Sequence, residues 1–150
     1  MKVALGADHR GYNAKNHIKI VLQELGVEVQ DFGTDSTKSC DYPDPAHAAT
    51  RAVQRGECDR GVLFCGTGIG MCVTANKFHG IRAALCHDEL TAEMSRRHND
   101  ANVLCLPADL VGNALMRRIV EVWLKTPFEG GRHKTRIDKI SEIERAQCKD

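Results

Sequence analysis

The sequence predicts a single α/β domain over residues 1–150, with a doubly wound, Rossmann/flavodoxin-like parallel sheet of five strands and helices on both faces. Two observations support this fold class. Short apolar segments typical of strands alternate with amphipathic segments typical of helices along the whole chain. The strand-like segments are apolar at nearly every position, as expected for parallel strands buried on both faces. Five such strands commonly take the order 2-1-3-4-5.

The expected strands are short runs of strand-forming residues between polar or glycine-rich turns. They cover residues 2–7, 27–32, 62–64, 81–86 and 102–106. The expected helices have apolar residues three and four positions apart, with glycine or proline near their ends. They cover residues 13–25, 45–54, 71–76, 89–98 and 108–125, and a last helix begins near residue 133. Asp44 and Asp88 are suitable N-cap residues for the second and fourth helices.

The last expected helix has a narrow apolar stripe, formed by Ile137, Ile140 and Ile143, in an otherwise charged segment. A helix with so little apolar surface can pack on its own domain, or it can extend as a C-terminal arm onto a second subunit. The sequence leaves these two alternatives open.

Composition excludes several classes of partner. With 21 basic and 20 acidic residues the net charge is +1, so no attraction to nucleic acid or to a membrane surface is expected. No apolar run approaches the length of a membrane span, and Met1-Lys2 leads directly into a strand, so no signal peptide is expected. Seven cysteines without a CxxC pair indicate reduced thiols in a cytoplasmic protein. The seven histidines lack ligand spacing such as HExxH, so no metal site is expected.

The segment from Arg60 to Lys77 organises the chain. An apolar strand ends at Cys65, three glycines follow at alternate positions, and a short helix comes next. Small residues at a helix start let backbone N–H groups approach an anion, and a thiolate is favoured at the same place. The spacing does not match the dinucleotide fingerprint, whose third glycine would stand at Met71, and no Gly-Lys-Ser/Thr follows. A tight turn with a structural cysteine is the alternative.

The expected sheet topology brings chemical groups together. In the order 2-1-3-4-5, ligands bind where the first and third strands end. Asp8 and His9 follow the first strand, and Cys65 ends the third, so we expect them to meet the glycine loop in one crevice. A thiolate base, a histidine and an anion cradle suit proton abstraction beside a carbonyl, without metal or cofactor. An aldose–ketose isomerase acting on a sugar phosphate fits this set.

Nearly the whole chain resembles one family, the type B ribose-5-phosphate isomerases, which also contains galactose-6-phosphate isomerase subunits. The resemblance depends on six motifs in order: Asp8-His9, Asp41-Tyr42-Pro43, Cys65-Gly66-Thr67-Gly68-Ile69-Gly70, Ala75-Asn76-Lys77, Arg96-Arg97-His98-Asn99-Asp100 and Gly130-Gly131-Arg132-His133. It implies interconversion of D-ribose 5-phosphate and D-ribulose 5-phosphate through a cis-enediolate, in the pentose phosphate pathway and without a cofactor. It also implies a homodimer or a dimer of dimers, with the site between subunits.

The resemblance also implies roles for individual residues. Cys65 is the base that moves a proton between C1 and C2, and His98 helps to open the furanose ring. Thr67 and four neighbouring amides hold the enediolate, those of Gly66, Gly68, Ile69 and Gly70. The other implied substrate contacts are Asp8 and Tyr42 at the ring, Asn99 elsewhere on the substrate, and His9, Arg132 and Arg136 at the phosphate.

Simpler interpretations stand beside these roles. Cys65 can be a small buried apolar residue, His98 can complement a helix dipole, and Arg132 can belong to a solvated basic face. Many family members have arginine where this chain has Asp109, which either alters substrate preference or caps the following helix. Three other functions remain: an isomerase of a hexose 6-phosphate of the allose or galactose type, a non-catalytic sugar-phosphate-binding protein, and a receiver domain. The last would need an aspartate where Cys65 stands.

Overall fold

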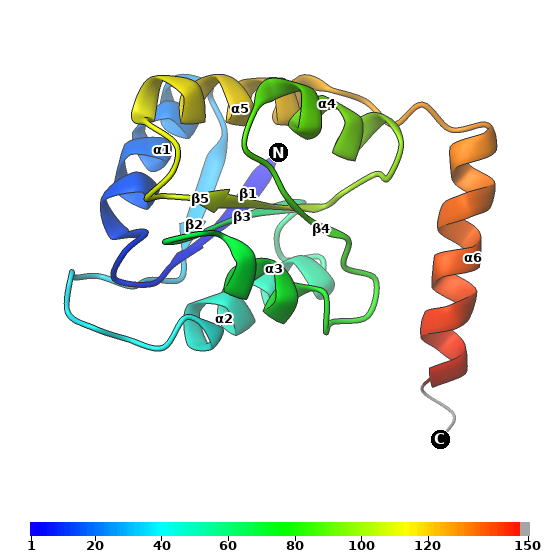
Figure 1. Ribbon diagram of the computed structural model, residues 1–150, viewed down its shortest axis with the longest axis horizontal. Helices are drawn as coiled ribbons and strands as arrows, with labels where there is room; N and C mark the ends of the chain where they lie inside the picture. The colour runs from blue at the N-terminus through cyan, green and yellow to red at the C-terminus, as the bar shows by residue number, and fades with distance from the viewer. Residues whose placement is uncertain (148–150) are drawn as a thin grey trace.

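A computed structural model describes residues 1–147 of the chain (Figure 1). Strands and helices alternate through most of it, as predicted. The strands are β1 (Lys2–Ala7), β2 (Glu28–Asp31), β3 (Arg60–Cys65), β4 (Ala83–Leu85) and β5 (Val103–Pro107). The helices are α1 (Tyr12–Glu24), α2 (Pro43–Gln54), α3 (Ile69–Ala75), α4 (Glu89–Arg97), α5 (Asn113–Lys125) and α6 (Arg132–Gln147).

The five strands form one parallel sheet in the order β2-β1-β3-β5-β4. The predicted fold class is confirmed, but the predicted order 2-1-3-4-5 is wrong in its last two strands. All five residues of β5 are buried, whereas β4 has only three residues and each is partly exposed. A parallel strand that is apolar throughout belongs in the centre of the sheet, and a short half-exposed strand belongs at its edge.

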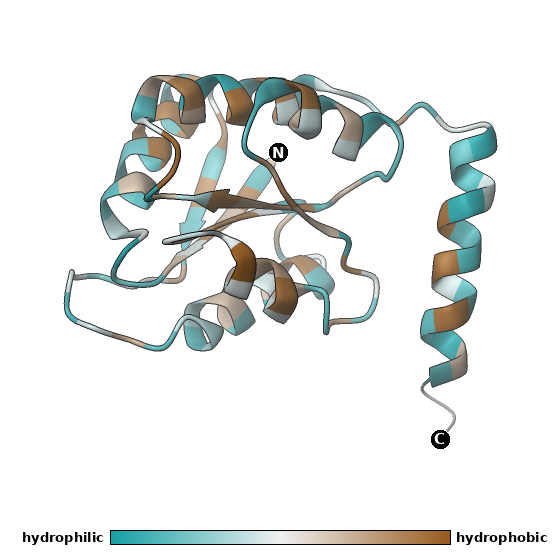
Figure 2. Cartoon of the chain, viewed as in Figure 1, coloured by the Kyte–Doolittle hydropathy of each residue, from teal (hydrophilic) through white to brown (hydrophobic). Residues whose placement is uncertain are grey.

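Helices cover both faces of the sheet, which gives three layers (Figure 1). α1, α4 and α5 lie on one face, where their apolar residues pack with Leu5, Phe64 and Leu104. α2 and α3 lie on the other face and pack with Leu63 and Cys105. In Figure 2 the apolar colouring is concentrated in the sheet and on the helix sides that face it. Each central strand thus buries alternate side chains in the two cores, which explains why its sequence is apolar at nearly every position.

Several helix ends differ from the prediction. The N-cap role of Asp88 is confirmed, because its carboxylate accepts a hydrogen bond from the Thr91 amide at 2.7 Å. Asp44 does not cap α2, because the helix begins two residues earlier than predicted, at Pro43, with Tyr42 at the N-cap. α5 begins at Asn113 rather than at residue 108, so residues 108–112 form a turn beyond β5. Either proline of the Pro-Asp-Pro segment suits the first turn, which is why sequence alone placed this start incorrectly.

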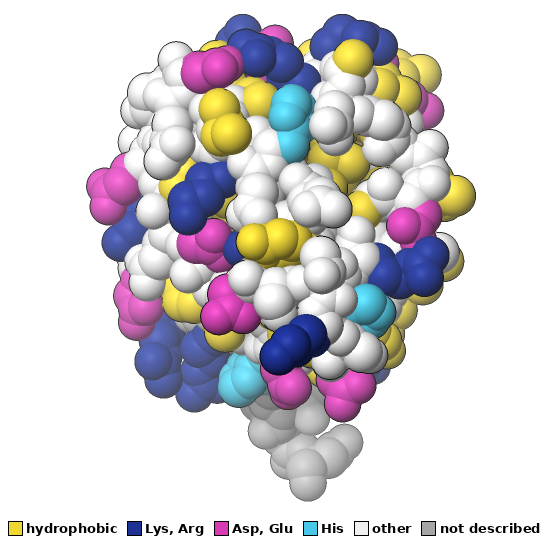
Figure 3. Space-filling model, turned by 90° about the vertical axis from the view of Figure 1, so that its left-hand side faces the viewer, with side chains coloured by type: hydrophobic (Ala, Val, Ile, Leu, Met, Phe, Trp, Pro, Cys, Tyr) yellow, Lys and Arg dark blue, Asp and Glu magenta, His cyan; other side chains and the backbone are white. Residues whose placement is uncertain are grey.

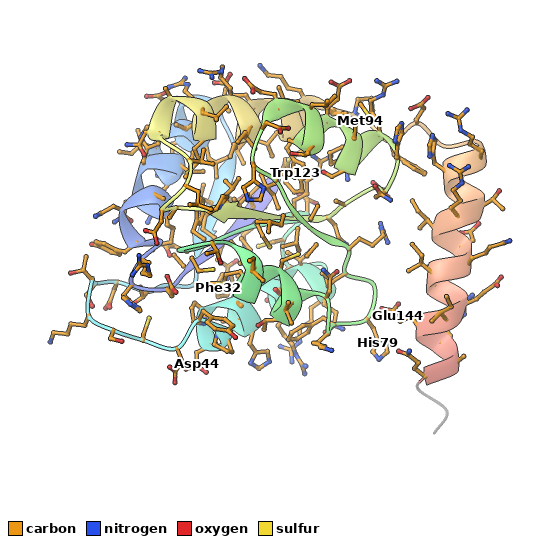
Figure 4. All side chains as sticks on the ribbon, viewed as in Figure 1. Phe32, Asp44, His79, Met94, Trp123 and Glu144 are labelled. Atoms are coloured by element: carbon orange, nitrogen blue, oxygen red, sulfur yellow. The ribbon has the colours of Figure 1, made fainter. Side chains whose placement is uncertain are left out.

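α6 stands apart from the layered domain as a C-terminal arm (Figure 1). Its first turns are anchored by the buried residues His133 and Ile137. Further along, Ile140 and Ile143 remain 51% and 61% exposed. Near its end, Glu144 accepts hydrogen bonds from the Gly80 amide at 3.0 Å and lies 3.7 Å from His79 (Figure 4). Two of the three isoleucines of the stripe are therefore not buried by the chain's own domain.

Two predictions from composition can be compared with the described residues. The six cysteines among them are free thiols, while Cys148 lies outside the described residues. Within residues 1–147, no helix has both the length and the apolar character that a membrane span requires.

Candidate active site

A cleft of about 290 Å³ opens where strands β1, β3 and β5 end. The loops after these strands and the start of α2 supply its lining, which consists of Asp8, Arg10, Tyr42, Cys65, Gly66, Thr67, Gly70 and Asp109. Figure 3 views the molecule from this side and shows charged groups of both signs among apolar ones. The expected meeting of the first and third strand ends is therefore observed, although His9 is not part of the lining.

Cys65 is the last residue of β3, and it faces two environments. It is only 5% exposed and packs in the core cluster that includes Met71 and Cys105, as the structural interpretation expects. It also lines the cleft, and its Sγ accepts a hydrogen bond from the Gly68 amide at 3.2 Å. The Gly68 N–H group is therefore a fixed hydrogen-bond donor directed at the sulfur. The geometry thus suits a base whose sulfur is shielded from bulk water.

The glycine loop is shaped by close contacts. Gly68 has φ of 74°, and a Cβ there would lie 2.5 Å from Leu85 Cδ1, so only glycine fits. Gly66 would place a Cβ 2.6 Å from Asp109 Oδ2. The Ile69 amide donates to Thr67 Oγ1 at 3.3 Å, which leaves the threonine hydroxyl proton free to donate elsewhere. Two amides of the predicted anion cradle, those of Gly68 and Ile69, are thus already directed at Cys65 and Thr67.

The loop after β1 holds Asp8 and His9, and the start of α2 holds Tyr42; of these three predicted residues, Asp8 and Tyr42 line the cleft. Asp8 is buried, and its Oδ1 accepts hydrogen bonds from the amides of Arg10 and Gly11 at 2.9 and 3.0 Å. Asp8 therefore stabilises the turn before α1 as well as lining the cleft. His9 Nδ1 accepts a hydrogen bond from the Cys40 amide at 3.2 Å, so a neutral imidazole has its proton on Nε2. Tyr42 packs its ring against Gly70.

The prediction that Asp109 caps a helix is wrong. Its carboxylate instead pairs with Arg10, whose Nε and Nη2 lie 2.6 and 2.5 Å from Asp109 Oδ2. Sequence reasoning missed Arg10 altogether. The two residues are 99 positions apart, and they meet because β5 lies directly beside β3. In the predicted order, β4 would have separated them, so no signal in the sequence paired these charges.

The remaining predicted residues lie at the other end of the sheet. α4 starts after the end of β4 and runs back to the start of β5. His98 and Asn99, at its C-terminus, therefore lie near the amino ends of the strands, whereas Cys65 lies at the carboxyl ends. Arg132 and Arg136 are exposed at the start of α6, near them. His98 stacks on His133 with ring centroids 4.1 Å apart, and its Nε2 is 3.6 Å from Glu129 Oε2. Within one chain, the cleft residues around Cys65 therefore lie apart from the four residues His98, Asn99, Arg132 and Arg136.

The histidine pair and Glu129 include the donor types of a zinc site, with ligand atoms within 4.8 Å of one another. The two rings are nearly parallel, at 7°. Lone pairs in the planes of stacked rings point side by side, whereas metal ligation needs them to converge on one point. This arrangement therefore suits a stacked pair better than a metal centre.

The environment of His133 predicts a pH effect on stability. Burial, followed by the positive charge of His98 and Arg132, lowers the pKa of His133 from its ordinary value. The unfolded chain then binds this proton more readily than the native chain, so stability falls as the pH drops through the ordinary histidine range, about 6.5. We expect thermal unfolding midpoints at pH 5 and pH 7 to differ less in His133→Gln than in the parent. The exposed His87→Gln should behave like the parent; an unchanged difference in His133→Gln would contradict this assignment.

Comparison with known proteins identifies the family. A family model described as Ribose/Galactose Isomerase matches residues 3–140. Ribose-5-phosphate isomerase B of Escherichia coli is 48% identical over 95% of this chain and 96% of its own. D-erythrulose-4-phosphate isomerase of Pectobacterium atrosepticum is 42% identical over 96% of this chain and 95% of its own.

A solved structure agrees with this result. Ribose-5-phosphate isomerase B of Clostridium thermocellum superimposes with a TM-score of 0.97 at 52% identity, covering 98% of this chain and 99% of that one. The family model's match, over residues 3–140, includes the strand ends and the glycine loop that form the cleft. The chain therefore belongs to the Ribose/Galactose Isomerase family.

Proposed function

We propose that this chain is an aldose–ketose isomerase that interconverts D-ribose 5-phosphate and D-ribulose 5-phosphate in the cytoplasm, as a step of pentose phosphate metabolism. Family membership supports the reaction class, and relatives named for ribose 5-phosphate support the substrate. The main observation that supports the mechanism is the position of Cys65. It ends β3 and lines the cleft, and the Gly68 amide is directed at its sulfur.

In the proposed reaction, the Cys65 thiolate removes the proton from C2 of the open-chain aldose. The electron pair forms the C1–C2 double bond, and O1 becomes the enediolate oxygen. The thiol then returns the proton to C1, while the proton on O2 passes to O1 and leaves the ketone. Backbone amides of the glycine loop stabilise the transient negative charge, because fixed dipoles in a sheltered site need little reorganisation. Thr67, whose oxygen accepts from the Ile69 amide, can donate its own proton to an enediolate oxygen.

We also propose that a second copy of the chain completes the site, in a homodimer or a dimer of dimers. The ring-opening residue His98, the contact residue Asn99 and the cations Arg132 and Arg136 lie away from Cys65 in one chain. Large apolar side chains are exposed on the loops and helices concerned: Ile69, Val73, Leu90, Leu110, Ile140 and Ile143. Such surface is typical of an interface rather than of a monomer. In this arrangement His9 Nε2 faces the phosphate together with the partner's Arg132 and the partner's Arg136.

A hexose 6-phosphate remains the alternative substrate. The relative from Pectobacterium is named for a four-carbon sugar phosphate, so substrate length differs among proteins this similar. Turnover on ribose 5-phosphate, allose 6-phosphate and galactose 6-phosphate, measured under one set of conditions, distinguishes the two assignments. The pentose should have the highest kcat/KM.

The base assignment predicts that Cys65→Ala lowers kcat by about 10²–10⁴-fold, the range typical of a lost general base, with a much smaller change in KM. The measurement is steady-state kinetics on ribose 5-phosphate. Cys58→Ala is a matched control, because Cys58 is also buried but precedes the amino end of β3, away from the cleft. Near-parental turnover by Cys65→Ala would show that another group removes the proton.

The shared site predicts complementation between inactive variants. Cys65→Ala and His98→Asn are each expected to have little activity alone, but their mixed dimer has one site with both residues intact. Co-expression should therefore give about a quarter of the parental specific activity, since half of randomly formed dimers are mixed and each has one intact site of two. A site built within one chain would give no recovery.

A further inference from the structure

The Arg10–Asp109 pair sits directly over the glycine loop of the cleft. Asp109 Oδ2 and Arg10 Nε would be 2.6 and 2.9 Å from a Cβ on Gly66, so the pair occupies the space that glycine leaves. Both residues line the cleft together with Cys65 and Thr67. Among the described residues that form this lining, Arg10 is the one side chain with a fixed positive charge.

Folding stability does not explain this pair. The side chains are 59% and 37% exposed, and ion pairs at such positions contribute little to stability because water screens them. The pair also requires a residue without a side chain at position 66. A weakly stabilising pair that restricts a neighbouring position in a cleft is better explained by what it presents to a ligand.

The geometry also fixes the orientation of the guanidinium. The backbone of the loop after β5 is attached to the tip of β3, because the Ala108 amide donates to Cys65 O at 2.9 Å and the Asp109 amide donates to Gly66 O at 3.0 Å. Asp109 is therefore held in place, and it engages Nε and Nη2 of Arg10 on one side. Nη1 has no hydrogen-bond partner among the described residues, so its two N–H groups remain available.

We propose that Arg10 is a phosphate-binding residue of this isomerase and that Asp109 is the positioning residue that orients it. A guanidinium presents planar, paired N–H groups that match phosphate oxygens, and it stays charged at every physiological pH. Arg10 also follows His9, the predicted phosphate contact, in the same loop. The proposal deepens the proposed function: it assigns the cation that the cleft itself contributes to binding the sugar phosphate.

The pairing accounts for an acid in a site that binds an anion. Asp109 would repel phosphate if it stood alone, but its charge is neutralised by Arg10 at 2.5 and 2.6 Å. The negative charge of Asp109 lowers the affinity of the cleft for phosphate to some extent. The same carboxylate restricts the rotamers of the long, exposed Arg10 side chain before the substrate binds, which lowers the entropic cost of binding. The two substitutions must therefore be coupled, because Asp109 helps binding only when Arg10 is present.

The test combines substrate kinetics with binding of inorganic phosphate, measured by calorimetry and as competitive inhibition. Arg10→Ala should raise KM for ribose 5-phosphate and the Kd of inorganic phosphate by about tenfold or more, as expected for loss of a charge-assisted contact, with kcat changed much less. Arg10→Lys should recover part of both losses. Arg117→Ala, which removes an ion pair with Glu24 on the helical face at 2.8 Å, is the matched control and should bind phosphate like the parent.

The coupling supplies a second readout that a merely structural pair would not give. Asp109→Asn alone should raise KM, but in the Arg10→Ala background it should cause no further rise. Parental KM and parental phosphate affinity in Arg10→Ala would overturn the proposal, as would additive effects of the two substitutions. A parent that binds phosphate through Arg10 but isomerises no sugar phosphate would instead contradict the proposed function alone.

Discussion

The chain around the tip of β3 is closely packed, and the site depends on that packing. Beyond Cys65, the Arg10–Asp109 pair leaves no room for a side chain at position 66, and Leu85 leaves none at position 68. The same tight turn directs the Gly68 amide at the Cys65 sulfur. Close packing thus shapes the loop, orients a hydrogen-bond donor toward the Cys65 sulfur and keeps the sulfur largely away from water.

The sequence predicted the elements and the cleft better than it predicted neighbours in space. Periodicity identified every strand, and the glycine spacing placed the loop after β3, because both signals are local. The order of the last two strands was wrong, since adjacency depends on which strand is buried on both faces, and β4 and β5 are both apolar. That error concealed the contact of Arg10 with Asp109, and the helix cap at Asp109 was excluded only because α5 begins at Asn113. The start of α2 was misplaced because Pro43 and Pro45 suit the same position.

The candidate site is divided between two ends of the sheet, and the fold explains the division. Residues that follow strands gather at the carboxyl edge, where Cys65 and Asp8 lie. Residues that end α4 and begin α6, such as His98 and Arg132, belong to the opposite edge. The arm α6, with its half-exposed isoleucine stripe, separates from the domain at this second group (Figure 1). Under the proposed assembly, folding supplies the proton-transfer half of the site and association supplies the rest.

The central claim is that hydrogen moves between C2 and C1 through a protein base rather than directly between the carbons. It is tested most directly by incubating the parent protein with ribose 5-phosphate in D2O and following C2 of the aldose by NMR. A thiol that exchanges with solvent should introduce deuterium at C2 as the two sugars equilibrate. Ketose formed with no solvent deuterium in either sugar, even after prolonged equilibration, would contradict the account.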